Sequence, residues 1–268
     1  MTNDKKIENS LIPIGSTGIV RVGNTINITN KLLGILTTKE FEVKYGAIQI
    51  NESKYTSSNF AETKFRNGDS IKEARTEDEW KYCVQNQIPA YCSYNNNPQN
   101  DLHFGILYNF YCISDSRGLA PNGWEIINKF PSKRVSDLQS KYFDVFELMS
   151  ESDWKLEYFN TNQESVNYSK NNNSSLFNAK PSGMRDEYGN FLGLNSSFSC
   201  WTSHWEYDES NLDKPKLTDK INILRINRYS ISQTINLGMG WLGSKLHSVA
   251  NCGEGHSIRF KKHNGSSI

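Results

Sequence analysis

The chain has 268 residues, a length that suits one large domain or one domain with an appendage. Its 30 Lys and Arg residues nearly balance its 29 Asp and Glu residues, so the formal net charge is +1. A charge this small gives no general attraction to nucleic acid or to an anionic membrane, and neither is expected as a partner. Aromatic residues make up 12% of the chain and supply buried area for a core, although hydrophobic residues reach only 36%.

The sequence contains no apolar run of the roughly 18–20 residues that span a bilayer, so membrane insertion is not expected. The first ten residues, MTNDKKIENS, are not followed by the apolar stretch of a secretory signal peptide. We therefore expect a protein made in the cytoplasm without a Sec signal. It either stays there, leaves by another route, or has lost a leader.

Residues 1–50 favour a β-rich N-terminal arm. The stretch LIPIGSTGIVRVGNTINITNKLLGIL alternates apolar and polar residues between glycine turns, which is typical of short hairpin strands. In KEFEVKYGAIQI the alternation of Phe41, Val43 and Tyr45 predicts a further strand. Because exposed strand edges readily pair, we expect the arm to dock on a protein partner or on another copy of the chain.

Residues 51–268 favour a second, mixed unit. Thr76 followed by Glu77, Asp78 and Glu79 predicts a helix start with an N-cap, and a structural role for the three acids is favoured over a catalytic one. A second helix is predicted at PSKRVSDLQSKYFDVF, residues 131–146. Strands are predicted in FSCWTSHW, INILRINRYSISQTI and HSIRFKK. Helices followed by strands and long loops predict an α+β fold.

Several blocks in this unit follow a recognisable order: TKFRNGDSI, EDEWKYC, PAYCSYNNNP, FGILYNFYCISDSRGLAPNGW, LFNAKPSGMRDEYGNF, SCWTSHW and GHSIRF. From about residue 56 to 262 the chain resembles the Fibrobacter succinogenes major paralogous domain, common in Bacteroidetes-type bacteria. The resemblance implies a C-type-lectin-like fold, shared with formylglycine-generating enzymes, with short twisted antiparallel sheets, two helices and long loops.

The resemblance also implies structural roles for the blocks LYNFY and PNGW. Their large rings would bury area between loops, and Asn109 and Ser203 would satisfy loop backbone groups. Burial of Trp124 is favoured over stacking on a sugar. The implied core residues are Tyr108, Asn109, Phe110, Trp124, Phe177, Trp201, Ile258 and Phe260.

Cysteine usage departs from that of the family. Many relatives have cysteines where this chain has Ala120 and Phe260. The five cysteines present are odd in number and form no CxxC pair, which argues against a metal knuckle or a complete disulfide framework. Buried thiols are expected at Cys83, Cys92, Cys112, Cys200 and Cys252.

An oxidoreductase like the formylglycine-generating enzymes is the first alternative for function. Those relatives bind copper through a cysteine pair in their C-terminal part, whereas Cys252 has only Cys200 in the last third of this chain. The His-x3-His-x-Glu array of a related iron-dependent branch is absent, as are a serine elbow and a nucleotide loop. We therefore expect no catalytic residues, no bound transition metal and no cofactor.

A ligand-binding module is the favoured hypothesis, with a cell-surface glycan or protein as ligand. The calcium-dependent sugar triplets of animal lectins are missing, so calcium-bridged sugar binding is not expected and nothing in the sequence supports a calcium cofactor. In DEYGN (residues 186–190) a turn is favoured over an ion site. Two segments, HWEYDESNLDKPK and NRYSISQTINLGMGWLGSKLHSVANCGE, carry side chains that dominate recognition surfaces. The predicted ligand-binding residues are Trp205, Tyr207, Asp208, Arg228, Tyr229, Asn236 and Trp241.

A structural component of a larger assembly is the third hypothesis, and it is compatible with the second. An arm formed by residues 1–50 would attach by strand addition while the second unit faces outward. A phage virion or a contractile injection particle suits a chain that is made in the cytoplasm and then released. Residence in the cytoplasm remains the alternative.

Overall fold

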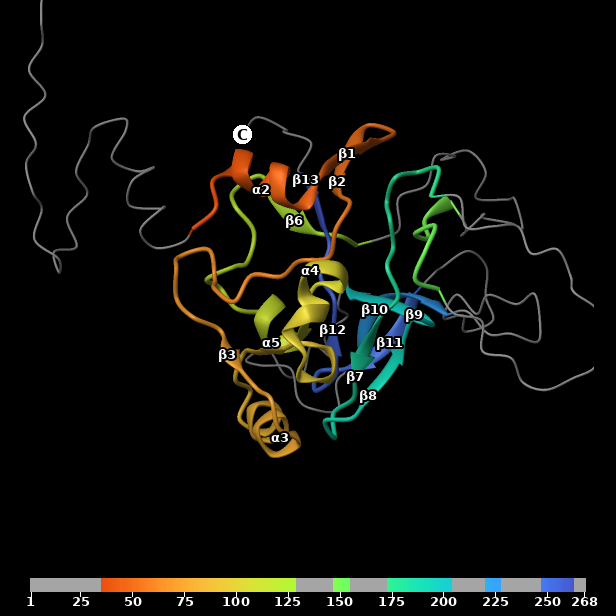
Figure 1. The fold of residues 1–268 in the computed structure, drawn as a ribbon. Coiled ribbons are helices and arrows are strands. Elements are labelled where there is room, and N and C mark those ends of the chain that lie inside the picture. Colours follow the sequence, from red (N-terminus) through yellow and green to blue (C-terminus); the bar gives the residue numbers. More distant parts are fainter. Residues whose placement is uncertain (1–34, 129–146, 155–172, 204–219, 228–246, 263–268) are drawn as a thin grey trace, which may run out of the picture.

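The computed structural model describes residues 35–128, 147–154, 173–203, 220–227 and 247–262 (Figure 1). It is a mixed structure of short helices and short strands, so the α+β prediction is confirmed. The α-helices are α2 (Thr38–Tyr45), α3 (Glu77–Gln85), α4 (Asp101–Phe104) and α5 (Phe110–Ile113), and the 3-10 helices are η1 (Tyr94–Asn96) and η2 (Pro98–Asn100). The strands are β1 (Ala47–Ile50), β2 (Ser53–Thr56), β3 (Lys72–Glu73), β4 (Ala90–Cys92), β5 (Leu107–Asn109), β6 (Trp124–Ile126), β7 (Ser182–Arg185), β8 (Phe191–Leu194), β9 (Ser197–Trp201), β10 (Lys220–Asn227), β11 (His247–Asn251), β12 (Gly255–His256) and β13 (Phe260–Lys262).

The strands form three sheets. A 6-stranded sheet has the order β3-β4-β5-β12-β7-β8 and is antiparallel except for the β3–β4 pair. A 4-stranded sheet has the order β1-β2-β13-β6, and a 3-stranded antiparallel sheet has the order β11-β10-β9. In the 4-stranded sheet the late strand β13 lies between the early strands β2 and β6 (Figure 1).

The strand predicted around Phe41 is wrong, because these residues form the helix α2. Thr37 caps the helix and forms a capping box with Glu40, in which the Glu40 amide donates to Thr37 Oγ1 over 3.3 Å and the Thr37 amide donates to Glu40 Oε2 over 2.9 Å. Phe41 and Tyr45 are four residues apart, so both lie on one helix face and both are buried. Of the stretch KEFEVKYGAIQI, only Ala47–Ile50 forms a strand.

Residues 38–50 are part of the folded body. The Phe41 ring lies 5.3 Å from the Trp124 ring and 5.5 Å from the Phe260 ring, measured between centroids. Tyr45 packs in the same way against Phe60, at 5.3 Å. The segment before residue 35, where hairpin strands are predicted, lies outside the described residues.

Helix α3 begins where the sequence predicts. The Glu79 amide donates to Thr76 Oγ1 over 3.1 Å, and Glu79 Oε2 accepts from the Thr76 amide over 3.0 Å. Backbone hydrogen bonds from Thr76 and Arg75 hold the pKa of Glu79 below its ordinary value. Glu79 therefore serves as a helix cap, which agrees with the structural role expected for the acids at this position.

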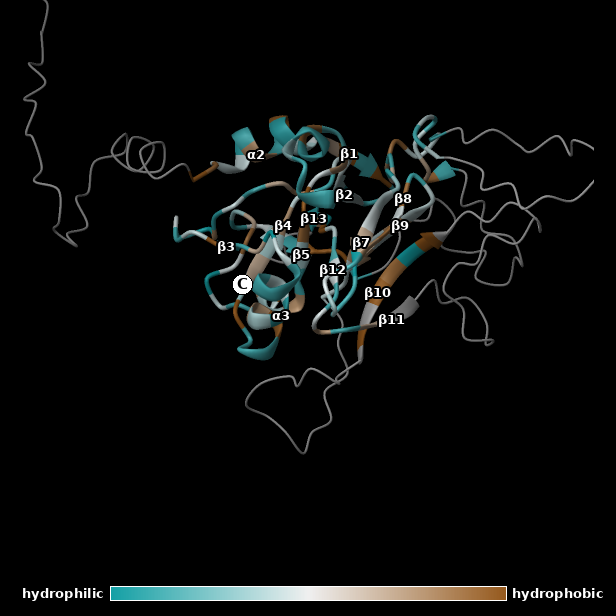
Figure 2. Cartoon of the chain, turned by 60° about the horizontal axis from the view of Figure 1, so that its bottom comes forward, coloured by the Kyte–Doolittle hydropathy of each residue, from teal (hydrophilic) through white to brown (hydrophobic). Residues whose placement is uncertain are grey.

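The 3-stranded sheet is buried on both faces. Ile221 and Ile223 of β10 belong to one hydrophobic cluster, together with Trp201, whereas Leu224 and Ile226 belong to a second cluster. This alternation is the period of two expected for a strand between two apolar layers. Figure 2 shows brown segments in β10 that are separated by a teal segment. The sheet is therefore fixed from both sides.

Two buried arginines hold segments that are distant in sequence. The guanidinium of Arg259 donates to Asn59 Oδ1 over 2.6 Å and to the carbonyl oxygens of Thr56, Phe177 and Asn178 over 2.8–2.9 Å. All these acceptors are uncharged. Planar guanidinium groups suit such sites because they present several donors in a fixed arrangement.

Arg185 acts in the same manner at the start of α3. Its guanidinium donates to the carbonyl oxygens of Ala74 (2.7 Å), Thr76 (3.1 Å) and Gly189 (3.0 Å). The Trp80 ring centroid lies 4.8 Å from the guanidinium carbon. Arg185 therefore joins β7 to the N-terminus of a helix more than 100 residues earlier, the sequence separation to Thr76 being 109.

The predicted C-terminal strands are present as β9, β10, β12 and β13 in the parts that the structure describes. The helix predicted at 131–146 lies outside the described residues. Among those that are described, no helix is long and apolar enough to cross a membrane.

Candidate functional site

The seven predicted ligand-binding residues all lie in two segments outside the described residues. Trp205, Tyr207 and Asp208 belong to residues 204–219, and the other members belong to residues 228–246. The described strands nevertheless fix where each segment begins and ends. The predicted ligand-binding residues in 228–246 are Arg228, Tyr229, Asn236 and Trp241.

Segment 204–219 attaches at the Lys220 end of the 3-stranded sheet. It follows β9, whose last residue Trp201 is opposite Ile223, and it leads into β10 at Lys220. Lys220 is opposite Asn251, the last residue of β11. This end of the sheet is therefore formed by the end of β9, the start of β10 and the end of β11.

Segment 228–246 attaches at the other end of the same sheet. It follows Asn227, which is opposite Ser197 at the start of β9. It leads into β11 at His247, which is opposite Leu224. Both of its attachments therefore lie beside the C-terminal half of β10.

The two segments leave from opposite ends of β10. Lys220 and Asn227 are separated by about 23 Å, since a strand advances roughly 3.3 Å per residue. The two segments that carry the predicted ligand-binding residues therefore follow or precede opposite ends of β10 along the chain.

Segment 204–219 begins beside another long segment. The Ser203 amide donates to the Ile127 carbonyl over 3.1 Å, and Ile127 is followed by residues 129–146. The described residues that precede 129–146 and 204–219 are therefore hydrogen-bonded to each other, although they are far apart in sequence.

The residues implied as core all lie in the interior. Trp201 is fully buried, and its indole Nε1 donates to the Tyr108 carbonyl over 2.7 Å. Trp124 retains only 6% exposure and contacts Phe41, so its ring is engaged within the protein. None of the implied core residues is more than 6% exposed; they are Tyr108, Asn109, Phe110, Trp124, Phe177, Trp201, Ile258 and Phe260.

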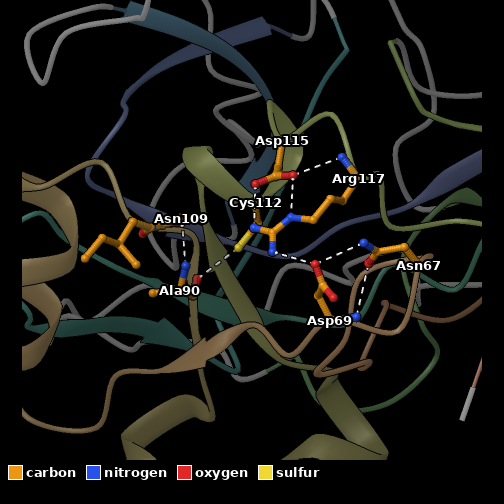
Figure 3. A network of polar contacts seen from close by, with 8 residues as sticks. Asn67, Asp69, Ala90, Asn109, Cys112, Asp115 and Arg117 are labelled. Atoms are coloured by element: carbon orange, nitrogen blue, oxygen red, sulfur yellow. Dashed lines mark hydrogen bonds and ion pairs between the residues drawn. The ribbon is translucent and has the colours of Figure 1, made fainter. Parts of the chain in front are cut away.

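Asn109 satisfies loop backbone groups (Figure 3). Its Oδ1 accepts from the Ala90 amide over 3.0 Å, and its Nδ2 donates to the Ile88 carbonyl over 2.8 Å. The Cys112 thiol donates to the Ala90 carbonyl over 3.3 Å. Ser203, for which the same role was expected, has an exposed side chain and contributes its backbone amide instead.

Figure 3 also shows Arg117 between two carboxylates. Its guanidinium forms two hydrogen bonds with Asp115, of 2.9 and 2.8 Å, and one of 3.2 Å with Asp69, whose carboxylate also accepts from Asn67. The Phe65 ring centroid lies 3.9 Å from the guanidinium carbon. The Arg117 hydrogen bonds lower the pKa of Asp115. These paired charges connect two surface turns.

A polar cluster in the interior was missed from the sequence. His256 on β12 is fully buried; its Nδ1 lies 2.7 Å from Ser199 Oγ on β9, and its Nε2 lies 3.0 Å from Glu254 Oε2. Arg225 Nη2 on β10 lies 3.8 Å from the same carboxylate oxygen. The spacing Glu254-x-His256 is visible in the sequence, but nothing local to it indicates the contribution of Ser199.

The hydrogen positions in this cluster follow from the charge states of its groups, because an ionised carboxylate can only accept hydrogen bonds. Burial lowers the pKa of His256 and outweighs the Glu254 hydrogen bond and charge, which raise it. Burial raises the pKa of Glu254, but the His256 hydrogen bond and charge, the Asn251 amide and Arg225 together hold it below its ordinary value. At neutral pH the imidazole is therefore neutral, with Nε2–H donating to the carboxylate and Nδ1 accepting from the Ser199 hydroxyl.

The order Ser199–His256–Glu254 contains the groups of a hydrolytic triad, but its placement differs from that of a nucleophile. Ser199 and His256 are both fully buried, and the hydroxyl donates to the ring inside the protein. An attacking hydroxyl needs a reachable position for the substrate carbon. The cluster is thus arranged to join strands.

The cysteines are buried thiols. Cys200 belongs to the hydrophobic cluster of Leu224, and Cys252 belongs to the cluster of Ile223, so the backbone of β10 lies between the two clusters. Burial raises the pKa of Cys200 to about 12. A thiolate, the form that binds metals and attacks substrates, is therefore disfavoured at Cys200.

The DEYGN segment forms a turn that uses its own acid. Asp186 Oδ1 accepts from the amides of Tyr188 (3.0 Å) and Asn190 (2.7 Å), and Oδ2 accepts from Asn190 Nδ2 over 2.8 Å. This is the local pattern by which Asp stabilises turns.

Comparison with known proteins identifies the family. The model of the Fibrobacter succinogenes major domain matches residues 48–260, most of the chain. No curated protein and no solved structure matches the chain. The match begins at β1 and ends at β13, so it spans the strands of all three sheets. The chain belongs to the Fibrobacter succinogenes major domain family.

Proposed function

We propose that this protein is a non-catalytic ligand- or receptor-binding protein that presents a C-type-lectin-like domain on a larger assembly. The observation that carries the proposal is the 3-stranded sheet, which is buried on both faces and carries a long segment at each end. Each segment carries one Trp and one Tyr, and residues 228–246 also carry Arg228, and these residue types dominate recognition surfaces. A fixed base with variable connections is a common design for binding proteins.

The C-type-lectin-like assignment is supported by the family membership and by the architecture. The structure has short, mostly antiparallel sheets, short helices and long connections between them. Buried arginines and buried aromatic rings contribute hydrogen bonds and apolar contacts that stabilise a structure with such short helices and strands.

The ligand we propose is a glycan or protein on a cell surface, bound without calcium. A glycan and protein array, with and without calcium, tests this with the purified chain. Because the two segments leave from opposite ends of β10, each requires its own variants. We expect Trp241→Ala with Tyr229→Ala to abolish binding, and Trp205→Ala tests the contribution of the other segment separately.

The array has distinct outcomes. Loss of binding only in Trp205→Ala would move the ligand site to the other end of the sheet. Unchanged binding in both variants would refute the assignment to these segments. Circular dichroism must match the wild type, because a misfolded variant would also lose binding.

The proposed attachment to the assembly is through the N-terminal segment by strand addition. The anchoring test must remove residues 1–34 rather than 1–50, because Phe41 and Tyr45 belong to the core. A shortened chain that still joins a phage virion or a contractile injection particle would contradict the anchoring role. A full-length chain that assembles but binds nothing on the array would instead support a purely structural component.

The oxidoreductase alternative requires Cys200 and Cys252 to share copper. Their positions in different hydrophobic clusters favour the binding protein over that alternative. Titration with copper(I) tests the point: a stoichiometric complex lost in both Cys200→Ser and Cys252→Ser would favour the enzyme.

A further inference from the structure

Strands β9 and β12 connect the 3-stranded sheet to the 6-stranded sheet. The Ser257 amide donates to the Ser199 carbonyl over 3.1 Å, and the Trp201 amide donates to the Ser257 carbonyl over 3.1 Å. His256 adds a side-chain hydrogen bond to Ser199. We call the contact formed by Ser199, Trp201, His256 and Ser257 the β9–β12 joint.

His256 lies at the centre of this joint. Its ring is fully buried and lies 4.7 Å from the Trp201 ring, edge to face. One ring nitrogen is held by Ser199 and the other by Glu254, as described above. The neutral ring therefore connects β12 to β9 through Nδ1 and to the turn before β12 through Nε2.

We propose that His256 makes the β9–β12 joint proton-sensitive, so that mild acid loosens the 3-stranded sheet from the 6-stranded sheet. Neutral His256 holds the joint closed. Protonated His256 is better accommodated when the joint opens and the ring reaches water. The sheet that would be loosened is the one to which segments 204–219 and 228–246 attach.

Burial has the largest effect on the pKa of the ring, and the described charges around it act in both directions. Glu254 favours the imidazolium, whereas Arg225 disfavours it. On β7, Arg185 directs its guanidinium to carbonyl oxygens including that of Ala74. On β5, Tyr108 is opposite His256 in register but donates its hydroxyl to the Glu62 carbonyl.

Protonation would also disturb the contact with β9. A hydrogen on Nδ1 would point at Ser199 Oγ, only 2.7 Å away, and the hydroxyl would have to turn away from the ring. Ser199 is fully buried, so its hydrogen would need a new partner inside the protein. Desolvation of the charge adds to this cost.

The direction in which pH changes the opening of the joint follows from the lowered pKa of His256 in the closed joint. Above the ordinary pKa of about 6.5 both states are neutral, and pH has no effect through this residue. Below it the opened joint binds a proton that the closed joint does not, so opening is favoured as pH falls. One proton changes the opening equilibrium by up to about tenfold per pH unit.

Amide hydrogen exchange between pH 7.5 and 5 tests the proposal with the wild-type chain. After correction for intrinsic rates, we expect protection of the Trp201 and Ser257 amides to fall by up to about tenfold per pH unit below 6.5. The Ser57 amide, which donates to the Tyr45 carbonyl over 2.9 Å in another sheet region, serves as the internal control and should keep its protection. Equal protection of the joint amides at pH 7.5 and 5 would overturn the proposal.

Two variants and a ring titration assign the effect to His256. In NMR, we expect the His256 ring to titrate below 6.5, and Glu254→Gln to lower that midpoint further because it removes the favourable charge. His256→Gln should abolish the pH-dependence of exchange at the joint. A midpoint at or above 6.5 in the folded wild type would overturn the proposal even if His256→Gln failed to fold.

Discussion

The guanidinium carbon of Arg259 lies 4.8 Å from the ring centroid of Phe177, and the same guanidinium donates a hydrogen bond to the Phe177 carbonyl oxygen. A single side chain thus uses its flat face for a ring and its edge for the backbone. Burial lowers the pKa of Arg259 to about 9, which still leaves the group charged at neutral pH. Burying a cation among uncharged acceptors costs free energy, and the site depends on the hydrogen bonds that compensate for this cost. Replacing Arg259 should therefore change the free energy of unfolding measurably.

Arg259→Lys should lower the free energy of unfolding by about 3 kcal/mol. A lysine ammonium cannot reproduce the planar arrangement, so several buried acceptors lose their donors. Urea unfolding measures the change, and Lys261→Met, two residues along the chain and only partly buried, is the control. A loss for Arg259→Lys no larger than that of the control would contradict the role assigned to Arg259.

Phe41→Ala should lower the free energy of unfolding by about 3–5 kcal/mol, the usual cost of removing a buried aromatic ring. On the same helix Val43 is 79% exposed, and Val43→Ala should change stability by no more than about 0.5 kcal/mol. Thermal or urea unfolding distinguishes the two variants. If they were equally stable, helix α2 would not be part of the core.

The native thiols should react slowly with Ellman's reagent. All five cysteines are buried, and burial raises the pKa of Cys92 and of Cys200 to about 12. Denaturation should release all five thiols to the reagent. Rapid labelling of any cysteine in the native protein would show an accessible thiolate and would revive the oxidoreductase alternative.

Calcium should not raise the melting temperature, because the Asp186 oxygens accept hydrogen bonds within their own turn. Asp186→Ala should cost about 1 kcal/mol, a typical loss for hydrogen bonds of this kind. Thermal unfolding with calcium and with a chelator measures both effects. A calcium-dependent rise in the wild type that is absent from Asp186→Ala would instead establish an ion site.

The capping signal correctly predicted the start of α3, whereas the apolar alternation wrongly predicted a strand at α2. Thr76 and Glu79 gave a clear helix start, and the structure contains the same capping box at Thr37 and Glu40. The second box was overlooked because Phe41 and Tyr45, four residues apart, fit both an alternating strand and one face of a helix. The capping signal was the more informative of the two.

The interior polar groups were the hardest to foresee. Arg259 and Arg185 are residues of a type normally found at the surface, and their acceptors are carbonyl oxygens that carry no sequence signal. Ser199 and His256 meet only because β9 and β12 are brought together by the sheets around them. Aromatic core residues, in contrast, were visible as a cluster of large rings beside glycines.

The position of β13 has a consequence for biosynthesis. Because β13 lies between β2 and β6, the 4-stranded sheet cannot close until residue 262 has left the ribosome. Strands β1 and β2 must wait, with Tyr55 lacking its partner Lys261, while some two hundred residues are translated. The β1–β2 hairpin of a nascent chain therefore has no neighbouring strand on its β2 side until β13 has been made.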